Sequence, residues 1–142
     1  MKLSDIMSSP VVTCSPDETL RVVGDIFKRT QFHHILVTEQ GVLTGVVSDR
    51  DFLKAISPNV GKASATAADR ATLNKRVSQV MSHSPIALPS TAKLIDVVAL
   101  FNQHRISCVP IINDQRAPVG IITWRDIMRV LLEKYQSKQG SI

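Results

Sequence analysis

Aromatic residues make up only 4% of this 142-residue chain, and this scarcity argues against a surface that stacks the bases of single-stranded nucleic acid. No apolar run is long enough to cross a bilayer, and the N-terminus lacks the apolar core of a signal peptide. The two cysteines, Cys14 and Cys108, lack the spacing of metal ligands. These absences predict a cytoplasmic protein with reduced thiols, no metal site and no membrane contact. Nucleic-acid binding is a third-ranked alternative, which would require a basic patch and salt-sensitive association.

Patterns of common catalytic sites are missing as well. The sequence has no phosphate-binding loop and no Ser-His-Asp arrangement. The acidic pair Asp17-Glu18 follows Ser15-Pro16 and has the composition of a helix start. The net charge of +5 permits an anionic partner without identifying one. We therefore predict that the protein is not an enzyme and requires no cofactor.

An internal repeat is the main positive feature of the sequence. Residues 45–51 (GVVSDRD) recur as residues 120–126 (GIITWRD). Residues 4–8 (SDIMS) likewise match residues 78–82 (SQVMS). Because the matching stretches keep their order and nearly their spacing, the duplication covers most of the chain.

The repeated motif predicts a particular local structure. In each copy a glycine and two β-branched residues read as a buried strand, which then runs into a helix. Ser48 and Thr123 are placed to cap the two helices, and Asp51 and Asp126 fall in their first turns.

Each repeat has the predicted order β-α-β-β-α, which is too small to bury its sheet alone, so two repeats are expected to pack together. We predict an α/β (α+β-like) fold with repeat 1 at residues 1–56 and repeat 2 at residues 76–135. Residues 57–75 belong to neither copy, and their Ala-rich composition predicts a partly helical inter-repeat linker. Residues 136–142 are expected to be a frayed C-terminal tail.

This arrangement resembles the cystathionine-β-synthase (CBS) domain pair, or Bateman module. The resemblance rests on the two Gly-β-β-[Ser/Thr]-x-x-Asp motifs and on the amphipathic helix that precedes each of them. It implies two repeats packed about a pseudo-two-fold axis, with two clefts that bind adenosine-containing ligands. In the family, the motif Asp holds the ribose hydroxyls, and the Ser or Thr lies by the ribose or phosphate.

The resemblance also implies two sets of ligand-binding residues. One cleft combines Ser48 and Asp51 with Ile86, Ala87, Val109, Pro110 and Arg125. The other combines Thr123 and Asp126 with Val12, Thr13, His33, His34, Ile35 and Arg50.

The two predicted clefts differ where family members often carry basic residues for phosphates. His33-His34 occupy these positions in the first repeat, and Ser107-Cys108 occupy them in the second. Our hypothesis from the sequence is that the Asp126 cleft prefers the phosphorylated ligand, whereas the Asp51 cleft binds weakly or not at all.

Each assignment has an alternative. Asp51 and Asp126 are also typical of acidic residues that only stabilise a helix N-terminus. His33 and His34 also fit a surface or strand-end role, and a metal role lacks further ligands at a suitable spacing. Trp124 fits packing as well as the mouth of a cleft or a dimer contact.

The resemblance implies a stand-alone regulatory module that senses AMP, ADP or ATP, ranked ahead of NAD and S-adenosylmethionine. Such a module is expected to form a homodimer and to signal through a change of conformation or assembly. The alternative is a module that binds no ligand and acts in dimerisation or protein interaction through its helices and residues 57–75.

Overall fold

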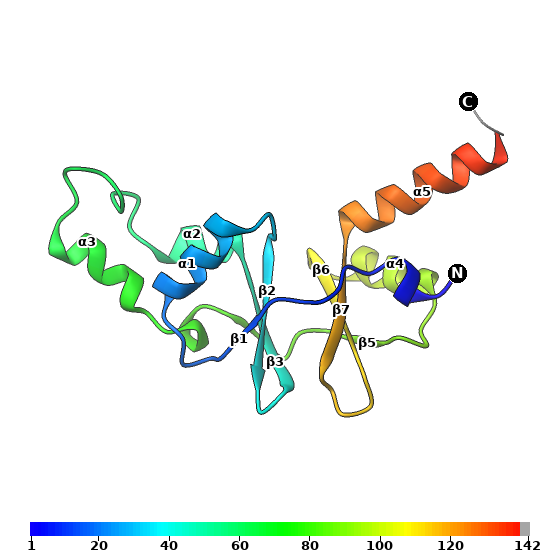
Figure 1. The fold of residues 1–142 in the computed structure, drawn as a ribbon, viewed down its shortest axis with the longest axis horizontal. Coiled ribbons are helices and arrows are strands. Elements are labelled where there is room, and N and C mark those ends of the chain that lie inside the picture. The colour runs from blue at the N-terminus through cyan, green and yellow to red at the C-terminus, as the bar shows by residue number, and fades with distance from the viewer. Residues whose placement is uncertain (140–142) are drawn as a thin grey trace. The chain divides into compact units, whose positions relative to one another are not determined.

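The computed structural model describes residues 1–139 and divides the chain into two compact units (Figure 1). The central unit is Val12–Pro85. The split unit joins Met1–Val11 to the segment that begins at Ile86. Both units mix helices with a small sheet, as the sequence predicts.

The central unit is built on a four-stranded sheet with the order β1-β2-β3-β4. β1 is parallel to β2, and the other two pairs are antiparallel. Its elements are β1 (Thr13–Cys14), α1 (Leu20–Arg29), β2 (His34–Glu39), β3 (Val42–Ser48), α2 (Asp49–Ala55), α3 (Ala67–Ala71), the 3-10 helices η2 (Thr72–Asn74) and η3 (Val77–Gln79), and β4 (Ser82–His83).

A tight turn joins β2 to β3. Gln40 and Gly41 both have positive φ angles, 51° and 81°. A two-residue turn needs such angles to match the right-handed twist of the two strands that it joins. β2 and β3 then place alternate apolar residues on the inner face of the sheet. Their core partner on α1 is Val23, and the buried cluster contains Val23, Ile35, Val37, Val47 and Val77.

The split unit repeats this plan with a three-stranded sheet, β5-β6-β7. Ser8 adds an isolated antiparallel bridge to Ile121 of β7, in the position that β4 has in the central unit. The elements of the split unit are η1 (Leu3–Asp5), β5 (Leu88–Pro89), α4 (Leu94–Gln103), β6 (Cys108–Ile112), β7 (Pro118–Thr123) and α5 (Trp124–Lys138).

The compact units do not coincide with the sequence repeats, because each unit contains the initial segment of the other repeat (the exchanged segment). Leu3 and Ile6 are buried in the core of the split unit together with Val97 of α4. Val77, at the start of the second sequence repeat, is buried in the core of the central unit. The start of repeat 1 therefore completes the core of the split unit, and the start of repeat 2 completes the core of the central unit.

Two methionines fill the space beside the two motif glycines. The Met81 sulfur lies 2.5 Å from the point where a Cβ at Gly45 would be. Met7 packs in the same way against Gly120. A Cβ at either glycine would displace the methionine, so glycine lets the side chain of the exchanged segment lie close to the strand backbone.

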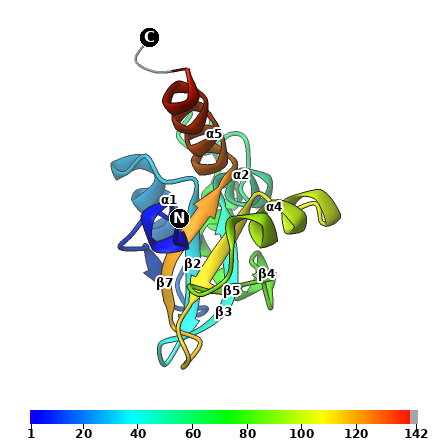
Figure 2. The same ribbon diagram turned by 90° about the vertical axis from the view of Figure 1, so that its right-hand side faces the viewer.

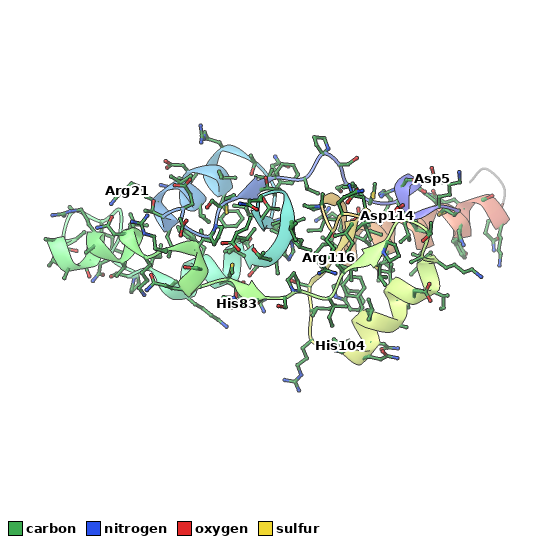
Figure 3. All side chains as sticks on the ribbon, turned by 90° about the horizontal axis from the view of Figure 1, so that it is seen from below. Asp5, Arg21, His83, His104, Asp114 and Arg116 are labelled. Carbon is green, nitrogen blue, oxygen red and sulfur yellow. The ribbon has the colours of Figure 1, made fainter. Side chains whose placement is uncertain are left out.

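The linker predicted at residues 57–75 folds onto the central unit. The Ser57 hydroxyl donates to Asp69 Oδ1 at 2.8 Å, and the Ser57 N–H donates to the Thr72 hydroxyl at 3.0 Å. Arg21 of α1, labelled in Figure 3, donates to Asn74 Oδ1 at 3.3 Å. The two Ser57 bonds close the linker on itself, and the Arg21 bond joins its end to α1.

The last helix is longer than the sequence indicates. α5 continues to Lys138 and extends away from the sheet of its own unit (Figure 2). Residues 140–142 of the predicted tail lie outside the described residues. Within residues 1–139, no helix has both the length and the apolar character needed to cross a membrane.

Candidate functional site

The corner between β3 and α2 holds the first motif Ser and Asp. The Ser48 hydroxyl accepts a hydrogen bond from the Asp51 N–H at 3.0 Å. The Asp51 Oδ2 in return accepts from the Ser48 N–H at 3.0 Å. This reciprocal pair is a capping box, which fixes both side chains at the start of the helix.

Asp51 also borders a hollow in the surface of the central unit. The hollow has a volume of about 420 Å³ and is lined by Asp51, Lys54, Ala55, Lys75, Gln79 and Val80. Lys75 Nζ donates to the Ala55 carbonyl at 2.6 Å, so Lys75 caps the C-terminal end of α2. The carboxylate of Asp51 is half-buried and can still meet a ligand from solvent.

The second motif Asp has a different environment. Asp126 is buried, with 7% of its surface exposed. Its Oδ2 accepts from the Thr123 N–H at 2.9 Å and from the Thr123 hydroxyl at 3.3 Å. Its Oδ1 accepts from Arg129 at 3.3 Å. Thr123 thus donates its hydroxyl to the carboxylate, whereas the matching Ser48 hydroxyl accepts from the helix backbone.

Arg129 extends this network to the N-terminal segment. Its guanidinium donates to the Ile6 carbonyl at 2.8 Å, so Asp126 and Arg129 together hold the exchanged segment against α5. Arg129 is not among the residues predicted from the sequence. The signal that could have found it is its spacing of three residues from Asp126, which brings the two side chains together on one helix face.

The two histidines differ in their surroundings. His33 Nδ1 lies 2.8 Å from Asp49 Oδ2 on the surface. Burial raises the pKa of Asp49, but the hydrogen bond and charge of His33 outweigh this effect and lower that pKa below its ordinary value. Burial lowers the pKa of His34, against the charges of Asp49 and Asp51, so His34 favours its neutral form. Arg50 and Arg125 are exposed.

The remaining predicted residues lie on or beside the first two strands of each unit. Val12 and Thr13 lie at β1, where the Val12 carbonyl accepts from the Leu36 N–H at 3.0 Å. Ile35 and Val109 are completely buried in the cores of their own units, which leaves their backbone groups rather than their side chains for a ligand. Ile86 and Ala87 are half-buried and precede β5, and Pro110 is buried within β6.

The cysteines do not provide a reactive site. Burial, with a smaller contribution from the charge of Glu18, raises the pKa of the Cys14 thiol to about 11, so the nucleophilic thiolate is scarce at neutral pH. Cys14 is a free thiol, and Cys108 is buried. Within residues 1–139, no group of three or more His, Cys, Asp or Glu side chains is arranged to hold a metal ion.

A family model, the CBS domain, matches residues 3–58 and 77–133. Among curated proteins, the CBS domain-containing protein YhcV of Bacillus subtilis is 33% identical over 88% of this chain and 81% of its own length. The chain spans only between 23% and 47% of the next three curated relatives, all from Methanocaldococcus jannaschii.

Solved structures share the fold. The CBS domain pair of protein MJ0100, in complex with 5'-methylthioadenosine and S-adenosyl-L-methionine, has a TM-score of 0.77 and 24% identity, and the match covers 94% of this chain and 98% of that one. The cytosolic domain of the Mg²⁺ channel MgtE, in complex with ATP, has a TM-score of 0.71 and 20% identity over 91% and 48% of the two chains. At these identities the likeness establishes the fold alone.

Proposed function

We propose that this chain, which belongs to the CBS domain family, is a regulatory module that binds an adenosine-containing ligand, with AMP, ADP and ATP ranked first. The observation that carries this proposal is the half-buried Asp51 at the edge of a hollow. A carboxylate can accept hydrogen bonds from the two vicinal hydroxyls of a ribose. Ser48 and its capping box would hold that carboxylate in place.

The solved relatives support this ligand class. The structure of MJ0100 contains two adenosine compounds, and that of the MgtE domain contains ATP. NAD and S-adenosylmethionine remain lower-ranked alternatives for this chain. The regulatory rather than catalytic role, and the cytoplasmic location, are parts of the same proposal.

We propose a ranking of the two motif aspartates that is the opposite of the one suggested by the sequence. Asp126 is buried and both of its carboxylate oxygens accept hydrogen bonds within its own unit. A ribose would have to compete with Arg129 and Thr123 for those oxygens. Asp51 uses only its Oδ2 atom to accept a hydrogen bond, from the Ser48 N–H. We therefore assign the leading ligand role to Asp51 and a mainly structural role to Asp126. The other residues predicted for the two clefts stay proposals.

A thermal-shift panel on the intact chain tests the ligand class. AMP, ADP, ATP, NAD, S-adenosylmethionine and 5'-methylthioadenosine are added at graded concentrations. A ligand present at about 100 times its Kd should add about 2.7 kcal/mol of stability and raise the Tm in a dose-dependent way. A flat panel on folded protein would contradict the proposal and favour the module that binds no ligand.

We also propose that the module forms a homodimer through α5. The side chains of Trp124, Met128, Leu131, Leu132 and Tyr135 are 51–59% exposed. Trp124, Met128, Leu131 and Tyr135 recur at steps of four, three and four residues, which is the spacing of a two-helix seam. An identical stripe on a second copy is a suitable partner because a two-fold axis pairs a surface with itself.

The dimer proposal predicts that Met128→Glu combined with Leu131→Glu halves the mass measured by analytical ultracentrifugation. In a dimer, the two introduced carboxylates would be buried against the same residues of the second copy, and this would oppose association. The fold should persist because both side chains are exposed in the single chain. Ser137→Glu is the matched control, since Ser137 lies on the opposite side of the same helix. A double variant that stays dimeric, or a wild type that is monomeric, would refute this interface.

A further inference from the structure

The hollow beside Asp51 carries an excess of positive charge. Its charged lining residues are one carboxylate, Asp51, and two lysines, Lys54 and Lys75. Among residues 1–139, the ion pairs are those of His33 with Asp49 and of Arg129 with Asp126 and Glu133. Neither lysine of the hollow is therefore neutralised by a carboxylate in the described part of the chain. An unpaired cation in a concave surface attracts an anion.

Lys75 lines the hollow and uses only part of its hydrogen-bond donor capacity. Its ammonium group has three N–H donors, and one of them bonds to the neutral Ala55 carbonyl. The bond to Ala55 holds Nζ near the C-terminal end of α2, and the hydrogens left over can meet a ligand. Lys54 lies on α2 itself, three residues after Asp51, so the two side chains lie on adjacent turns of one helix face.

The backbone around Lys75 is fixed to the start of α1. The Lys75 carbonyl accepts from the Leu20 N–H at 2.9 Å, and the Val77 N–H donates to the Glu18 carbonyl at 2.8 Å. The Arg76 guanidinium donates to the Asp17 carbonyl at 2.7 Å. Lys75 lies between the two ranges that the CBS domain model matches, so the family model does not cover this position.

We propose that this hollow is the subsite for the phosphate of the ligand, bound by Lys54 and Lys75 while Asp51 holds the ribose. The inference rests on the proposed function and makes it more specific. It predicts that the module selects a phosphorylated adenosine and discriminates against adenosine itself. It also predicts discrimination against S-adenosylmethionine, whose sulfonium cation would face two ammonium groups at the same position.

Calorimetric titrations with AMP, adenosine and inorganic phosphate test this subsite. For Lys54→Gln and Lys75→Gln we expect AMP to bind about tenfold more weakly than to wild type, because each variant loses a charge-assisted contact to phosphate. Adenosine binding should stay unchanged in both variants. Lys75→Arg should retain most of the AMP affinity, since it keeps the charge and the donors. Lys62→Gln is the matched control, because Lys62 is an exposed lysine of the same unit outside the hollow.

The possible results separate this inference from the proposed function. If adenosine and AMP bind but the lysine variants leave their affinity ratio unchanged, the phosphate subsite is refuted while the proposed function stands. If inorganic phosphate binds in a lysine-dependent way and AMP binds no more tightly than phosphate, the hollow is a free-anion site and the proposed function fails for this hollow. If none of the three compounds binds, the phosphate subsite is refuted, and the thermal-shift panel with the remaining ligands decides whether the proposed function stands.

Discussion

Leu3→Ala should lower the free energy of unfolding by about 2–5 kcal/mol, even though Leu3 is only the third residue of the chain. The reason is the exchanged segment: Leu3 is completely buried in the cluster that includes Val97, Val109 and Ile122 of the split unit. Removing its branched side chain leaves a cavity among residues that are far away in the sequence. Chemical denaturation followed by circular dichroism measures the change.

Lys2→Ala is the control for this effect, because Lys2 is exposed and such a change is expected to stay within about 0.5 kcal/mol of wild type. Val77→Ala provides a second comparison, since Val77 is the matching buried residue of the central unit. It should destabilise the protein in the same direction. A Leu3→Ala variant as stable as Lys2→Ala would show that the N-terminal segment does not complete the core.

The second large effect concerns the two motif aspartates, which occupy matching positions in the two repeats. Asp126→Ala should cost about 2–3 kcal/mol of stability, since it leaves the Thr123 N–H without its acceptor and removes one of the two carboxylates that pair with Arg129. We lower the value usual for a buried ion pair because the Arg129 side chain is 45% exposed. Asp51→Ala removes a partner of a half-exposed capping box and should cost about 1 kcal/mol.

Urea denaturation of the two alanine variants decides this comparison. Asp126→Asn serves as the control, because its amide oxygen can still accept from the Thr123 N–H while the ion pair with Arg129 is lost. Its stability should fall between wild type and Asp126→Ala. Equal costs at the two aspartates, or a larger cost at Asp51, would contradict the structural role assigned to Asp126.

Local structure could be predicted from the sequence because its signals are local. The Gln40-Gly41 turn, the alternating strands and the Ser48-x-x-Asp51 cap each depend on residues within a few positions of one another. The repeat and the CBS resemblance then supplied the fold class, which the comparisons confirm.

Long-range contacts could not be predicted in the same way. Nothing local in the sequence around Leu3 indicates that its side chain enters a core built from residues after position 86. The different surroundings of Thr123 and Ser48 depend on Arg129 and on its bond to the Ile6 carbonyl. Lys75 reaches the hollow only because the linker folds back onto α1 and α2. Each of these features requires tertiary structure.

The most direct test of the account is the affinity of AMP for Asp51→Asn and Asp126→Asn, measured by isothermal titration calorimetry beside wild type. Asparagine keeps an oxygen for the neighbouring backbone N–H but removes the charge that would bind the ribose hydroxyls. We predict that Asp51→Asn weakens binding by about 10–100-fold, while Asp126→Asn binds nearly as wild type does. Unchanged affinity in Asp51→Asn, with a loss in Asp126→Asn, would contradict the central claim that Asp51 is the leading ligand-binding residue.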